Sequence, residues 1–183
     1  MGGMHTWMWG ERWPQFMDGL VPLASAPVQI AGRNRVWRKM AADDLRRGDT
    51  AGAIQLLMIA TSSPLQWQKS GPTRHDADRW LAEQMKTRLA AADPDDLLYA
   101  LEASRNYDPS PNLGKIEAPL LAINSADDFV NPPELGILER EIRKVKRGRY
   151  VLIPTSDATR GHGAHTWATL WEQYLRALDT PPR

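Results

Sequence analysis

Residues 118–128 read APLLAINSADD, and this stretch decides which fold the sequence can adopt. Its apolar run carries no charge and leads directly into two adjacent acidic residues, Asp127 and Asp128. A short apolar run of this kind is typical of a strand that is buried on both faces of a parallel sheet. We therefore expect a buried strand here, followed by two carboxylates.

After this strand the sequence alternates between predicted helices and a further predicted strand. Residues 132–146 (PPELGILEREIRKVK) have the pattern of one amphipathic helix with proline at its start. Residues 148–157 (GRYVLIPTSD) form a second apolar run, and residues 165–179 (HTWATLWEQYLRALD) predict a closing amphipathic helix. This alternation of strand and helix indicates an α/β fold with parallel strands.

The part of the chain before this stretch is mainly helical in character. Residues 4–17 predict a short helix that ends near Gly10, and residues 19–27 (GLVPLASAP) predict a short buried strand and a loop. Residues 28–106 are expected to be helical throughout. Two or three strands are too few for a stable open sheet. We therefore expect the chain to hold the tail half of an α/β domain.

The composition excludes several classes of function. The 183 residues contain no cysteine, which removes disulfide scaffolds, cysteine-ligated zinc and thiol nucleophiles. The net charge of +1 gives no reason to expect binding to nucleic acid. No apolar run approaches the roughly 18 residues that span a bilayer, so no membrane partner is expected. No secretory signal is visible, which favours the cytoplasm for a complete chain, but the location of a longer protein stays open.

Candidate catalytic groups follow the two predicted strands of the C-terminal part. In open α/β sheets, active groups gather at the carboxyl ends of the strands. The first strand ends at Asp127 and Asp128, and the second runs into SDATRGHGAHTW (156–167), which carries His162 between two glycines. An acid after one strand and a histidine after the next is the chain order of the last two members of a Ser, Asp, His triad on an α/β-hydrolase sheet.

A second histidine leaves an alternative open. His165 is expected in the first turn of the closing helix, three residues after His162. Two histidines at this spacing, with Asp157 as a third ligand, would form a metal site. We prefer the catalytic interpretation of His162 and expect no metal.

Three segments resemble a known family. They are MGGMHTWMW (1–9), SRNYDPSPNLGKIEAPLLAINSADDFVNPPEL (104–135) and TRGHGAHTW (159–167). Together they resemble the α/β-hydrolase superfamily, and within it the homoserine O-acetyltransferase-like branch. The resemblance implies an α/β core at residues 1–27, a helical lid at residues 28–110 and a C-terminal α/β core at residues 111–183.

The resemblance also implies roles for individual residues. In this family a Gly-x-Ser-Met-Gly-Gly-Met elbow presents the nucleophilic serine, and residues 1–4 match its second half. Asp128 would be the triad acid, because it stands four residues before Pro132 as in the family's D-x-x-x-P loop; Asp127 is the alternative acid. His162 would be the general base, and the backbone N–H of Met1 would supply half of the oxyanion hole.

The nucleophile itself is expected in front of Met1. None of the serines of this chain stands in a G-x-S-x-G setting, so the chain is expected to hold acid and base without the nucleophile and to be inactive alone. The resemblance implies serine-dependent acyl transfer or ester hydrolysis on a small-molecule ester or acyl substrate. It implies no cofactor, with acetyl-CoA as co-substrate if the protein is a transferase.

Gly163 departs from the acyltransferase pattern, in which an acidic residue generally follows the histidine. Ester hydrolysis therefore stays open beside transfer to homoserine. A non-enzymatic alternative is an interaction or assembly module of the same fold, with its exposed sheet edge covered by a partner chain. A homo-oligomer is compatible with both interpretations.

Overall fold

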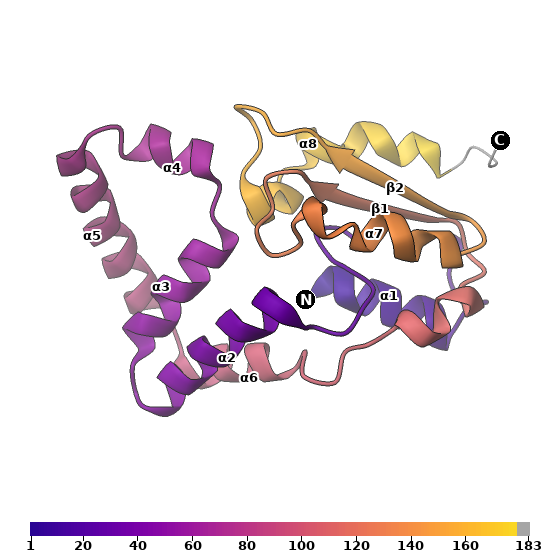
Figure 1. Ribbon diagram of the computed structural model, residues 1–183, viewed down its shortest axis with the longest axis horizontal. Helices are drawn as coiled ribbons and strands as arrows, with labels where there is room; N and C mark the ends of the chain where they lie inside the picture. Colours follow the sequence, from indigo (N-terminus) through magenta and orange to yellow (C-terminus); the bar gives the residue numbers. More distant parts are fainter. Residues whose placement is uncertain (179–183) are drawn as a thin grey trace.

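A computed structural model describes residues 1–178, and its elements fall into a small sheet with flanking helices and a group of five helices beside it (Figure 1). Residues 179–183 lie outside the described part, so the last residue of the expected closing helix and the end of the 111–183 segment are not covered.

The sheet contains the two strands that the sequence predicts. Strand β1 (Leu120–Ser125) pairs in parallel with β2 (Gly148–Ile153), with Leu120 opposite Gly148 and Ser125 opposite Ile153. The α/β fold class and its parallel strands are thereby confirmed. The carboxyl ends of both strands lie at the same edge of the sheet, as parallel pairing requires.

The strand expected within residues 19–27 is reduced to isolated contacts. Leu20 and Leu23 form parallel bridges with Leu120 and Ile123, on the side of β1 away from β2. The backbone N–H of Leu20 donates to Pro119 O, and that of Ala24 donates to Ile123 O. Leu20 O and Pro22 O accept in turn from the N–H groups of Leu121 and Ile123. Pro22 has no N–H to donate, so one hydrogen bond of this ladder is missing.

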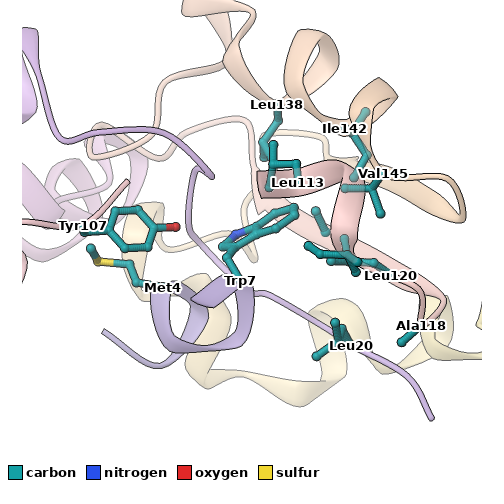
Figure 2. Packing of buried hydrophobic residues seen from close by; sticks show 12 residues of the cluster. Met4, Trp7, Leu20, Tyr107, Leu113, Ala118, Leu120, Leu138, Ile142 and Val145 are labelled. Carbon is teal, nitrogen blue, oxygen red and sulfur yellow. The ribbon is translucent and has the colours of Figure 1, made fainter. Parts of the chain in front are cut away.

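Strand β1 is buried along its whole length because helices cover both faces of the sheet. On one face Leu120 and Ala122 pack with Trp7 of α1 (Gly2–Arg12) and Leu138 of α7 (Ile137–Glu141), as Figure 2 shows for the labelled members. On the other face Leu121 and Ile123 contact side chains of α8 (Ala168–Trp171) and the 3₁₀ segment η5 (Glu172–Ala177). This two-sided burial explains why the sequence of β1 is continuously apolar instead of alternating.

The expected helical region is confirmed, and we refer to its five helices as the helical segment. They are α2 (Gly32–Arg46), α3 (Thr50–Thr61), α4 (Pro64–Ser70), α5 (Arg74–Ala91) and α6 (Pro94–Glu102). Side chains of Asp49, Thr73 and Asp93 accept hydrogen bonds from the first turns of α3, α5 and α6, as N-caps do. Trp37, Leu45 and Leu101 form part of a core of this segment, and Val130 from the loop after β1 joins it.

The predicted bounds of the two helices in the C-terminal part are wrong. The single helix expected over residues 132–146 is divided into η2 (Pro133–Leu135), α7 and η3 (Ile142–Lys144). Gly136 causes the first break, because it adopts a left-handed conformation with φ of 59°.

The closing helix also begins later than expected. His165 lies in the 3₁₀ segment η4 (Gly161–Thr166), and α8 begins only at Ala168. The histidine loop therefore continues through His165 before the last helix starts.

The first turn of α1 packs against the segment that borders β1. A Cβ on Gly3 would overlap Leu23 O and lie 2.6 Å from Ser25 Oγ, whereas a Cβ on Gly2 would meet nothing within 4 Å. Only glycine at residue 3 therefore allows this close approach of helix and strand.

We predict that Gly3→Ala lowers the free energy of unfolding by about 1–3 kcal/mol, because the added methyl group forces backbone apart. The matched control Gly2→Ala should leave stability unchanged or slightly raised, since alanine is the better helix former. Urea unfolding of the three proteins measures the difference. Equal stability of the two variants would contradict this account of the packing.

Candidate active site

Asp128 lies in the loop directly after β1 and is almost fully buried. Its Oδ1 accepts hydrogen bonds from the backbone N–H groups of Val130 (2.8 Å) and Asn131 (3.4 Å). Its Oδ2 accepts a hydrogen bond from Asn131 Nδ2 at 3.2 Å. The loop that follows the strand thus holds this carboxylate in one orientation.

His162 lies beside it, 34 residues further along the chain. Its Nδ1 is 3.0 Å from Asp128 Oδ2, and its side chain is 23% exposed. An ionised carboxylate can only accept, so Nδ1 carries the proton of the neutral ring and Nε2 is left as its basic nitrogen. The two residues that the sequence selects as acid and base are therefore in direct contact, which is the geometry their expected roles need.

Asp127 is also buried, but its oxygens have other partners. Oδ1 accepts from Ser125 Oγ at 2.5 Å, and Oδ2 accepts from Ser63 Oγ at 2.8 Å and from the backbone N–H of Gly161 at 2.9 Å. Burial acts to raise the pKa of Asp127, but these hydrogen bonds together lower it below its usual value. Of the two adjacent carboxylates, Asp128 is the one that the structure places against the histidine.

A cavity of about 380 Å³ opens next to this pair. Met1 and His162 both line it, as expected if the histidine and the backbone at Met1 act on the same group. The loop after β1 contributes Phe129 to Pro133, and the first turns of α2 form part of the opposite wall. The cavity therefore lies between the helical segment and the edge of the sheet where the strands end.

The cavity wall also contains polar residues that the sequence did not single out, among them Arg38, Tyr107 and Tyr150. Arg38 Nε donates to Asn34 Oδ1 at 2.8 Å, and its guanidinium lies over the Trp37 ring, 4.7 Å from the centroid. Burial and the charge of Arg35 lower the pKa of Arg38. Burial raises the pKa of Tyr150 to about 12. In the sequence Arg38 is one of four basic residues within RNRVWRK, and nothing in that run separates it from the others.

The alternative metal site is not assembled. His165 Nδ1 faces His162 O at 2.5 Å, while Asp157 is exposed and lies 3.3 Å from Lys69 Nζ. Within residues 1–178, no group of three or more His, Asp or Glu side chains is arranged to hold a metal ion. No helix in the same range combines the length and the apolar character needed to cross a membrane.

Comparisons with known proteins show similarity in sequence and in fold. No family model matches the chain. A homoserine O-acetyltransferase of Moorella thermoacetica is 26% identical over 203 residues, an alignment that covers 90% of this chain. Among solved structures, esterase E22 matches 97% of the chain with a TM-score of 0.81 at 16% identity. The homoserine O-acetyltransferase of Bacillus anthracis matches 98% with a TM-score of 0.80 at 14% identity.

The chain therefore has part of the α/β-hydrolase fold, and its sequence is similar to that of a homoserine O-acetyltransferase.

The chain spans only part of the length of these proteins. The chain covers 53% of the length of the Moorella protein and 58% of the lengths of the two solved structures. The chain likewise covers 58% of the length of an acetylester hydrolase from Corynebacterium glutamicum, which it matches with a TM-score of 0.78. In this chain the loops after two parallel strands carry Asp128 and His162.

We predict that Asp127 makes stability sensitive to acid. Its pKa in the folded protein is lowered, so its ionised form stabilises the fold above the unfolded pKa of about 4, and this contribution is lost as the pH falls through the folded pKa. Asp127→Asn should therefore lower the free energy of unfolding at pH 7, and the gap to the wild type should close as the pH falls below about 4.

Urea unfolding of both proteins between pH 7 and pH 2.5 measures this gap. A difference that stays constant over the whole range would show that ionisation of Asp127 contributes nothing.

Proposed function

We propose that the protein to which this chain belongs catalyses serine-dependent acyl transfer or ester hydrolysis, with Asp128 as the acid and His162 as the general base. One observation carries the proposal. His162 Nδ1 lies 3.0 Å from the buried Asp128 carboxylate, and the histidine lines a cavity that it shares with Met1.

The chemistry follows from the orientation of the ring. Nε2 of His162 takes the proton of the serine hydroxyl as the serine oxygen attacks the acyl carbon, and Asp128 stabilises the imidazolium that forms. The ring then gives this proton to the leaving alcohol, and an acyl-enzyme remains. Attack by water releases the free acid, whereas attack by a second alcohol completes a transfer.

The serine is proposed to stand directly before Met1. Residues 1–4 (MGGM) then continue the nucleophile elbow into α1, and the backbone N–H of Met1 donates to the oxyanion of the tetrahedral intermediate. The close packing of Gly3 against Leu23 O supports this placement, because it brings the start of α1 directly to the end of the strand segment beside β1.

A small acyl ester is the proposed substrate class. The cavity is lined mainly by apolar groups from residues such as Met4, Val28, Ile30 and Leu138. Gly163 follows the histidine and offers no charge to an amino group. These features support ester hydrolysis at least as well as transfer to an amino acid, and acetyl-CoA belongs to the proposal only as a co-substrate of the transfer.

We predict that His162→Gln lowers kcat for a short-chain p-nitrophenyl ester about 10⁶-fold and Asp128→Asn about 10⁴-fold, with KM little changed, because both act on the transition state. The assay uses the protein translated with the residues that precede Met1 in its reading frame. His165→Gln is the matched control and should retain activity, because this exposed ring does not contact Asp128.

A fluorophosphonate probe identifies the nucleophile in the same protein. It should label the serine adjacent to Met1, and the 183-residue chain alone should stay unlabelled. Labelling of Ser25 or of another serine within the 183 residues, or full activity of His162→Gln, would overturn the proposal.

A second candidate function, assembly without catalysis, is favoured by α5. No residue of this 18-residue helix is buried, and Leu81 and Leu89 on one of its faces are 44% and 42% exposed. We propose a second copy of the chain as the partner for this face. Apolar side chains at this spacing form a contact stripe along a helix.

Sedimentation velocity tests this assembly. We predict that the chain sediments as a dimer or larger species, and that Leu81→Asp shifts it to the monomer because a carboxylate cannot be buried unpaired. Thr87→Asp, an exposed site on another side of α5, is the matched control and should leave the assembly unchanged. A wild-type monomer at micromolar concentration would exclude this candidate.

A further inference from the structure

Three segments that are distant in the sequence meet at the Asp127 carboxylate. Ser125 belongs to the end of β1, Ser63 to the short linker between α3 and α4, and Gly161 to the loop that carries His162. Each donates a hydrogen bond to Asp127, at 2.5, 2.8 and 2.9 Å. Asp127 and Ser63 are both buried. Asp127, which the sequence offers as an alternative acid, therefore links the helical segment to the histidine loop.

Gly161 also brings the histidine loop into close backbone contact with the helical segment. Gly161 has a φ of 58°, a left-handed conformation that favours glycine. A Cβ at this residue would overlap Ser62 O and lie 2.8 Å from Ser62 C. The backbone of the α3–α4 linker thus lies directly on the residue before His162.

Helix α4 contacts the same loop a few residues earlier. Gln66 Nε2 donates to the backbone oxygens of Asp157 and Thr159, both at 2.9 Å. Figure 1 shows the end of α3 and the start of α4 on the side of the helical segment that faces the loop after β2. The loop from Asp157 to Gly161 is therefore held by the helical segment on one side and by Asp127 on the other.

We propose that Asp127 is a positioning residue that, together with Ser63, ties the helical segment to the His162 loop, so that His162 keeps its contact with Asp128 only while this segment stays docked. The inference rests on the proposed function for the role of His162, and it adds that movement of the helical segment controls the base. Release of Ser63 would remove the hydrogen bond by which the helical segment reaches Asp127 Oδ2, and it would loosen the backbone in front of the histidine.

The test compares Ser63→Ala with Ser62→Ala in the 183-residue chain. Ser62 is the adjacent residue of the same linker, but its hydroxyl donates to Ile59 O and not to Asp127. Two quantities are measured by NMR: the exchange rate of the His162 Nδ1 proton, which the bond to Asp128 protects, and the exchange rates of the backbone amides of residues 157–163.

Ser63→Ala should raise both exchange rates at least about tenfold, since a hydrogen bond to a charged group is lost. Asp127→Asn should do the same, and Ser63→Thr, which keeps the hydroxyl, should restore wild-type rates. Ser62→Ala should change neither. Unchanged rates in Ser63→Ala, or equal increases in both serine variants, would overturn the inference, because the second result indicates general loosening of the linker.

These readouts do not depend on activity, so the two proposals can fail separately. Labelling of no serine in the longer protein would contradict the proposed function. If Ser63→Ala still speeds exchange of the His162 Nδ1 proton in that case, the inference about Asp127 is supported on its own. If the longer protein is active, Ser63→Ala should lower kcat by at least about tenfold with KM within twofold. An unchanged kcat there would count against control of the base by the helical segment.

Discussion

The parallel pairing of β1 with β2 is the interaction on which the rest of this structure depends. Parallel strands end at the same edge of a sheet, so the pairing brings the loop after Ser125 next to the loop after Ile153. Asp128 and His162 are 34 residues apart in the chain, and no local structure could bring them together. Helices on both faces of β1 protect this pairing from water, and the cavity lies at the edge that the strand ends define.

The strands and the helical region could be predicted because their sequences agree with their environment. A continuous apolar run such as residues 120–125 fits burial on both faces, and the helices start at side-chain caps such as Asp49 and Asp93. The breaks in the later helices could not be predicted as readily. Gly136 ends one turn through a left-handed backbone, and a 3₁₀ segment over Gly161–Thr166 precedes α8.

The candidate site also combines features that the local sequence predicts with features that only the tertiary structure decides. The sequence shows that an acid follows one predicted strand and a histidine follows the next. This order pointed to Asp128 and His162. The choice between Asp127 and Asp128 is decided by which carboxylate faces the neighbouring loop, a property of the tertiary structure. Arg38 and Tyr150 reach the cavity wall from segments that carry no motif, so only the folded chain reveals them.

The place of the helical segment in the chain has a physical consequence for the site. It is inserted between α1 and β1, yet it contacts both loops that hold the candidate pair: Val130 packs into its core, and Ser63 reaches Asp127. The acid side is held by the burial of Val130, by the hydrogen bonds of Asp128 within its own loop, and by Arg33 Nη1 and Asn34 Nδ2 of α2, which donate to Phe129 O and Val130 O. The histidine side is held by Ser63 through Asp127, by the side chain of Gln66, and by the contact of Gly161 with the Ser62 backbone. Directional hydrogen bonds and close backbone contacts tolerate little displacement. A shift of the helical segment would therefore act on both loops at once, and it would change the distance between Nδ1 of His162 and Asp128.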